Sequence, residues 1–194
     1  RQILDLFEKL AIEAYEAGGG LYPLLGNHEI MNVEEDFRYV TPEGWEAFAD
    51  IPFDSSDERL APYEDYQKPR VAAFIPKGVY AEILARHNLT MVVGTTLFIH
   101  GGILPVHTVY GLDRMNQETQ QWIRGESSQP TFFSGDFDPV WSRHYSDEPD
   151  EIDCNLAQNT LLATNTKRIV VAHTVQIGGI NTACDGIILR VDVG

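Results

Sequence analysis

Three short apolar runs in this sequence are each followed by a histidine at a turn, and this repeated arrangement constrains the fold more than any other feature. Short runs rich in β-branched or aromatic residues, bounded by glycine or polar residues, predict buried strands. The carboxyl ends of parallel strands meet at one edge of an α/β sheet, where such proteins build their sites. We therefore expect the polar residues after the runs to lie close together. The three stretches are 21–29, 97–102 and 169–174.

The polar residues that end these runs have the chemistry of a metal site. The amide oxygen of Asn27 is a hard ligand, and the imidazoles of His100 and His173 are borderline ligands, so the set suits a divalent metal ion. His28 lies beside Asn27 and can act as a proton donor. The competing interpretation of 26–29 is an ordinary turn with a capping Asn27, and a single histidine after a strand is more often structural. Three such strand ends together favour the metal site.

The same segments resemble a known family. Gly26-Asn27-His28-Glu29, His100-Gly101-Gly102 and Val171-Ala172-His173-Thr174 are similar to the second half of the calcineurin-like metallophosphoesterases. Within that superfamily they resemble PPP-type phosphoprotein phosphatases of the Shewanella-like, bacterial-type branch. The resemblance implies an α/β fold in which a two-sheet β-sandwich is flanked by helices. Further segments that fit this branch are 36–40, 139–143 and 184–194.

The first two motifs of the family, Gly-Asp-x-His-Gly and Gly-Asp-x-x-Asp-Arg-Gly, do not occur in this sequence. In the family they precede the helix that leads into Gly26. We therefore expect residues 1–194 to be the C-terminal portion of a single metallophosphoesterase domain that lacks its N-terminal part. The weakly patterned stretch 30–76 is too long for an ordinary connection, and we expect it to form a lid or a substrate wall beside the site.

The resemblance also implies a metal site. Asn27, His100 and His173 match the ligands of one of two divalent metal ions, for which Mn, Fe, Zn and Co are the candidates. The ligands of the other ion belong to the two motifs that do not occur here. Three neutral ligands without a bridging carboxylate are expected to hold a metal weakly. We therefore expect residues 1–194 alone to be inactive.

Three further residues have roles that the resemblance implies or allows. His28 matches the general acid that protonates the leaving oxygen. Arg143 matches an arginine that lines the phosphate pocket. Arg38 is a second candidate for binding phosphate, because a guanidinium can hold two phosphate oxygens at once. The alternative for Arg38 is a surface salt bridge with one of the acidic residues 34–36.

Together these residues predict a metal-dependent phosphomonoester hydrolase in which two metals activate a water. Its expected substrate is a phosphoprotein carrying phosphoserine, phosphothreonine or phosphotyrosine. Two alternatives stay open. The first is a metallophosphoesterase that acts on nucleotides or other small phosphoesters. The second is a non-catalytic module that binds a phosphorylated partner.

Charge and cysteine content exclude several other classes. The formal net charge of −15 argues against a nucleic-acid-binding surface, which needs clustered Lys and Arg. No apolar run reaches the roughly 18 residues of a membrane span, so no membrane partner is expected. Cys154 and Cys184 allow one disulfide but no disulfide framework. We expect an intracellular, reducing compartment, either cytoplasmic or organellar.

The remaining pattern alternates helices with strands, which is typical of α/β proteins. Apolar residues at helical spacing over 3–14 predict an amphipathic helix that ends at Gly18-Gly19-Gly20. His107 is expected in a loop, and Asp153 is expected to cap a helix. The other predicted helices are a short one at 43–49 and those at 78–87, 113–124 and 154–163. The predicted strands are 21–25, 89–93, 96–99, 169–172, 177–180 and 186–193.

Overall fold

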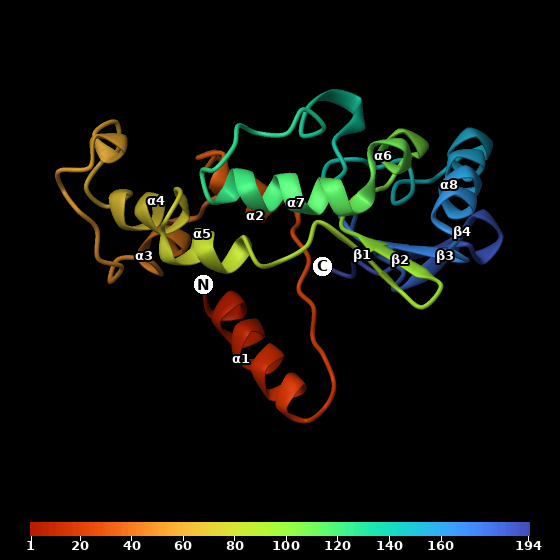
Figure 1. Ribbon diagram of the computed structural model, residues 1–194, viewed down its shortest axis with the longest axis horizontal. Coiled ribbons are helices and arrows are strands. Elements are labelled where there is room, and N and C mark those ends of the chain that lie inside the picture. Colours follow the sequence, from red (N-terminus) through yellow and green to blue (C-terminus); the bar gives the residue numbers. More distant parts are fainter.

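The computed structural model describes residues 1–194 as a mixed α/β protein with one five-stranded sheet (Figure 1). The strand order is β1-β2-β3-β5-β4. Neighbouring β2, β3 and β5 are parallel, whereas β1 and β4 pair antiparallel at the two edges. The expected α/β class is confirmed, but only one sheet forms, so the second sheet of the expected sandwich does not occur within these residues. The strands are β1 Thr90–Val93, β2 Thr96–Ile99, β3 Arg168–Val171, β4 Asn181–Ala183 and β5 Ile188–Arg190.

The central strands are the β-branched runs that the sequence singled out. Leu97 of β2 lies opposite Ile169 of β3, and Ile169 lies opposite Ile188 of β5. All three side chains are fully buried. Because β2 and β3 run parallel in this register, the residues that follow them emerge at the same edge of the sheet. The predicted hairpin between β1 and β2 is also confirmed, with Gly94 in the left-handed region at φ 60°.

The chain forms eight α-helices, and five of them were predicted. The helices expected at 3–14, 43–49, 78–87, 113–124 and 154–163 correspond to α1, α3, α5, α7 and α8, with shifted ends. Asp150, and not Asp153, caps α8, because its carboxylate accepts bonds from the backbone N–H groups of Ile152 and Asp153. The helices are α1 Gln2–Glu16, α2 Asn27–Val33, α3 Pro42–Glu46, α4 Lys68–Phe74, α5 Val79–Leu84, α6 Pro105–Tyr110, α7 Leu112–Ile123 and α8 Glu151–Thr164.

Three local expectations were wrong. The segment 21–25 is extended but not a regular strand, because Pro23 has no N–H to donate and the only bridge joins Leu24 to Asn88. His107 lies in α6 and not in a loop; it is buried, and its ring bonds the Leu104 backbone N–H and the Phe137 carbonyl. The C-terminal hairpin pairs β5 with 181–183 and not with 177–180.

Helix α1 is amphipathic as expected, yet none of its residues is buried. It stands beside the rest of the chain and is connected to it by the extended segment 17–26 (Figure 1). Leu4 packs against the edge of the main core, whereas Ile3 and Ile12 are more than half exposed. The main core of 26 buried residues is formed instead by the sheet and by the helices that follow α1. None of the eight helices combines the length and the apolar character needed to cross a bilayer.

Cys154 of α8 and Cys184, in the turn between β4 and β5, form a disulfide with their Cα atoms 5.3 Å apart. This is the single bridge that the cysteine count allows. A bond of this kind persists in an oxidising compartment, whereas a reducing compartment keeps the two thiols free.

Replacing both Cys154 and Cys184 by Ser should lower the free energy of unfolding by about 3.5 kcal/mol, because the bond closes a loop with a sequence separation of 30. The change is measured as a lower urea midpoint. As a control, a thiol reductant should shift the wild-type midpoint by the same amount and leave the double variant unaffected. An unchanged midpoint in the variant would show that the bond does not contribute to stability.

Candidate functional site

Three predicted ligands meet beside the carboxyl ends of the central strands β2 and β3. His100 directly follows β2, His173 lies two residues beyond β3, and Asn27 is the first residue of α2. His100 Nε2 lies 2.8 Å from Asn27 Oδ1 and 3.1 Å from His173 Nδ1. The expected convergence of these three side chains is therefore present in the structure. Their roles as metal ligands remain a prediction.

Local backbone geometry places each of the three side chains. Gly26 precedes α2, and its N–H donates to the carboxylate of Glu29 at 2.9 Å, which satisfies a free donor at the start of the helix. A Cβ at Gly26 would approach His100 Nδ1 to 3.0 Å, so glycine allows the close approach of the two segments. His173 has a φ of 66°, in the left-handed region that residues other than glycine rarely adopt. Such backbone strain is concentrated at functional sites in proteins.

The two histidines are neutral at ordinary pH. Burial lowers the pKa of His100 to about 4, and the neighbouring His173 adds to the effect. Burial also lowers the pKa of His173 to about 4, together with the positive charge of Arg143. A neutral imidazole is the form that binds a metal, since its ring nitrogen then has a free lone pair.

His173 Nε2 is buried and has no hydrogen-bond partner. Buried ring nitrogens are normally satisfied, so this one is an exception. The nitrogen that meets the other two predicted ligands is His173 Nδ1, on the other position of the ring. An amide oxygen and two neutral imidazoles fit one divalent metal ion by donor type. The set contains no carboxylate, and no group of three or more His, Cys, Asp or Glu side chains is placed to hold a metal anywhere in residues 1–194. The cluster is therefore a neutral and partial donor set.

His28 and Arg143 face the same cavity as the three predicted ligands. The cavity has a volume of about 370 Å³. Arg143 Nη1 donates to the carbonyl oxygen of His173 at 3.2 Å and to Thr174 Oγ1 at 2.7 Å. Arg143 has no carboxylate partner, so its charge remains available to an anion. The residues that line the cavity are Asn27, His28, Tyr39, His100, Trp141, Arg143, His173, Val175 and Asp192.

Arg38 is not among the residues of this cavity. Its guanidinium is exposed and donates through Nε to Asp36 Oδ1 at 2.9 Å. The structure therefore favours the salt-bridge alternative for Arg38. His144, which follows Arg143 in the chain, turns away to Asp153, with His144 Nδ1 2.6 Å from Asp153 Oδ1.

Sequence reasoning did not single out three aromatic or charged residues that line the cavity. The ring of Tyr39 lies 5.7 Å from that of His28, and Trp141 meets the ring of His173 edge-on at 5.4 Å. Asp192 is the only carboxylate in the lining. All three lie in segments that fit the family resemblance, and this was the only sequence feature that could have pointed to them.

Comparison with known proteins agrees with the family resemblance seen in the sequence. Residues 1–176 match the family model described as calcineurin-like phosphoesterase. The chain is 36% identical over 225 residues to Shewanella-like protein phosphatase 2 of Arabidopsis thaliana, covering all of this chain and 58% of that protein. It is 29% identical over 203 residues to an uncharacterised protein of Schizosaccharomyces pombe, covering all of this chain and 57% of that one.

Among solved structures, the cold-active protein-tyrosine phosphatase of a Shewanella species superimposes with a TM-score of 0.76 at 23% identity. The match covers all of this chain and 55% of that one. At this identity the likeness concerns the fold. The chain thus spans little more than half the length of these relatives.

Proposed function

Because the chain belongs to the calcineurin-like phosphoesterase family, we propose that it contributes to a metal-dependent phosphatase whose substrates are phosphorylated side chains of proteins. The meeting of Asn27, His100 and His173 beside Arg143 carries this proposal. Two relatives, from Arabidopsis and from Shewanella, are named protein phosphatases, which supports a protein substrate over a small phosphoester.

Asn27, His100 and His173 are the residues that would hold a metal ion. When bound, a divalent ion neutralises phosphate charge and lowers the pKa of a bound water, which makes that water a nucleophile near neutral pH. We propose two ions in the complete domain, with Mn, Fe, Zn and Co as candidates. The family motifs that supply the ligands of the second ion do not occur in residues 1–194.

Arg143 is proposed to bind the phosphoryl oxygens. Only its Nη1 is bonded within the protein, so Nε and Nη2 remain free to donate to an anion. A guanidinium offers two parallel N–H groups that match two phosphate oxygens. Its anchoring to the His173 carbonyl and to Thr174 fixes the guanidinium beside the predicted metal ligands.

His28 is proposed to protonate the leaving oxygen. Its side chain is exposed at the start of α2 and lines the same cavity as Arg143. The side chain of Asn32 donates to the His28 carbonyl at 2.6 Å, and the Tyr39 ring packs against the imidazole. These contacts hold the residue while leaving its ring nitrogens free for a proton transfer.

Metal removal from the natural full-length protein tests this proposal. Phosphopeptide turnover should fall to background after treatment with a chelator and return on addition of Mn²⁺, because the attacking water depends on the metal. Residues 1–194 alone should show little or no turnover, since three neutral donors hold a divalent ion weakly.

The same assay separates the two alternatives. A metallophosphoesterase for small molecules would hydrolyse a dinucleoside polyphosphate faster than any phosphopeptide. A binding module would show no turnover, and its affinity for a phosphopeptide would be unchanged by the chelator. Robust metal-dependent turnover by residues 1–194 alone would contradict the expected need for the second set of ligands.

A further inference from the structure

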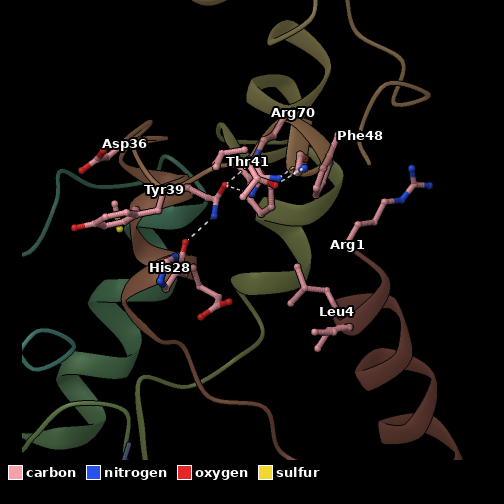
Figure 2. A pocket seen from close by; sticks show the side chains of 15 residues that line it. Arg1, Leu4, His28, Asp36, Tyr39, Thr41, Phe48 and Arg70 are labelled. Atoms are coloured by element: carbon pink, nitrogen blue, oxygen red, sulfur yellow. Dashed lines mark hydrogen bonds between the residues drawn. The ribbon is translucent and has the colours of Figure 1, made fainter. Parts of the chain in front are cut away.

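His28 also lines a second cavity (Figure 2). It has a volume of about 340 Å³, within the range of ligand pockets. His28 and Tyr39 line both this cavity and the one that contains the predicted metal ligands, so the two spaces adjoin. Figure 2 shows Arg70 and His28, from α4 and α2, flanking the same space.

Two arginines, Arg1 and Arg70, lie in the wall of this cavity. Arg1 forms salt bridges with Asp5 and Asp50, so Arg70 is the one whose charge no described contact uses. Its Nε and Nη2 donate to Asn32 Oδ1 at 3.1 and 2.8 Å, and its Nη1 donates to the Gly44 carbonyl at 2.8 Å. Of the five N–H groups of a guanidinium, two therefore remain unused. Arg70 forms no salt bridge, so its positive charge has no anionic partner within the chain.

Burial of Arg70 is costly without such a partner. It lowers the pKa of the guanidinium to about 10, and desolvation is the only cause. The rings of Phe48 and Phe74, with centroids 4.6 and 5.3 Å from Cζ, offset part of this cost through cation–π attraction. Arg114 provides a contrast, because it lies over Tyr110 but is also paired with Glu118 at 2.7 Å.

The two carboxylates in the wall of the cavity are already engaged. Glu29 accepts from the Gly26 N–H, and Asp36 pairs with Arg38. The remaining wall is largely apolar and includes Leu4, Met31, Val40, Phe48 and Phe74. An apolar cavity with one desolvated cation fits an oxyanion carried on a short aliphatic or aromatic arm.

We propose that Arg70 forms a second anion subsite, which binds an acidic group of the phosphorylated substrate close to the residue being dephosphorylated. This inference rests on the proposed function and specifies its substrate class: phosphopeptides with a carboxylate or a second phosphate near the phosphorylated residue. The stretch 30–76, expected from the sequence to form a substrate wall, supplies Arg70 and most of this cavity. The subsite is a local exception to the net charge of −15, which otherwise repels anions.

Binding of non-hydrolysable phosphonate peptides to the natural full-length protein tests the subsite. One peptide sequence is prepared with Ala, Glu or phosphoserine at each position flanking the phosphonate, and affinities are measured by calorimetry. Glu or phosphoserine at one position should bind about tenfold more tightly than Ala, as expected for one charge-assisted hydrogen bond. The Glu and phosphoserine series distinguish the two sources of the anion.

Variants assign the preference to Arg70. Arg70→Met keeps the aliphatic stem over the aromatic rings, and the ratio of acidic to Ala affinity should fall to about one. Arg70→Lys keeps the positive charge but not the parallel N–H groups of the guanidinium, so it should retain part of the preference. This variant still tests the subsite if Arg70→Met does not fold. Arg114→Met is the matched control, since it also removes an arginine from an aromatic ring, and it should keep the full preference.

Equal binding of acidic and Ala peptides at every position, or an unchanged preference in a folded Arg70→Met protein, would overturn the subsite. Hydrolysis of the corresponding phosphorylated Ala peptide is measured in parallel and tests the proposed function separately. Hydrolysis without an acidic preference leaves the phosphatase proposal standing and rejects the subsite. An Arg70-dependent preference without hydrolysis of any peptide keeps the subsite and rejects the phosphatase proposal.

Discussion

Replacement of His28 by Asn is expected to lower kcat for a phosphoserine peptide by about 10²–10⁴-fold, the usual contribution of a general acid. The alkoxide of serine is a poor leaving group, so its departure requires a proton. Asn preserves a polar side chain at the exposed start of α2 but cannot transfer the proton. The measurement is steady-state kinetics of the natural full-length protein with its metals bound.

The leaving group provides the decisive comparison for His28. An aryl phosphate with an acidic phenol leaves without protonation, so His28→Asn should reduce its turnover far less than that of phosphoserine. Equal losses on both substrates would show that His28 acts through structure or binding. His144→Asn is a suitable control: the Asn side chain can still donate to Asp153, and turnover should stay within about threefold of the wild type.

Replacement of His173 by Gly is expected to reduce turnover by at least about 100-fold, because even residues that only orient metal ligands contribute 10–100-fold. Gly is chosen because φ at this position is 66°, where most other residues would add backbone strain. The measurement combines kinetics with metal content by elemental analysis. Metal bound per chain should fall together with activity.

Two companion variants interpret that result. His100→Ala should cause a similar loss, and combining it with His173→Gly should add little, since residues that act as one unit are not additive. Arg143→Lys should keep the full metal content while raising KM, because it alters the phosphate contact only. Full metal content in His173→Gly would exclude His173 as a ligand.

The parts of the fold that the sequence predicted are those with strong periodicity or β-branched runs. Strands β2 and β3 consist of such runs, and their parallel pairing brings His100 and His173 together. Helices α2, α4 and α6 were missed because six or seven residues give too few turns for an apolar period to be visible. The segment 21–25 reads as a strand by composition, yet an extended run without a partner strand does not form a sheet.

Site residues that directly follow a strand could be predicted from the sequence. Residues whose partners depend on tertiary contacts could not. Arg143 and Arg38 are equally suited to phosphate by chemistry. Arg38 has a carboxylate two residues away and pairs with it, whereas Arg143 has none and faces the cavity. Arg70 gave no signal, since only Phe74 of its aromatic neighbours lies on the same helix, whereas Trp45 and Phe48 come from a segment that is distant from it in sequence.

The bond between Cys154 and Cys184 turns the segment between them into a covalent ring that contains β3 and His173. The disulfide therefore keeps α8 close to the C-terminal hairpin even when the packing around them is lost. If β4 separates from β5 at the edge of the sheet, the disulfide still holds the ring to the hairpin. Amide hydrogens of β3 should accordingly exchange more slowly than those of β1, which lies outside the ring at the opposite edge.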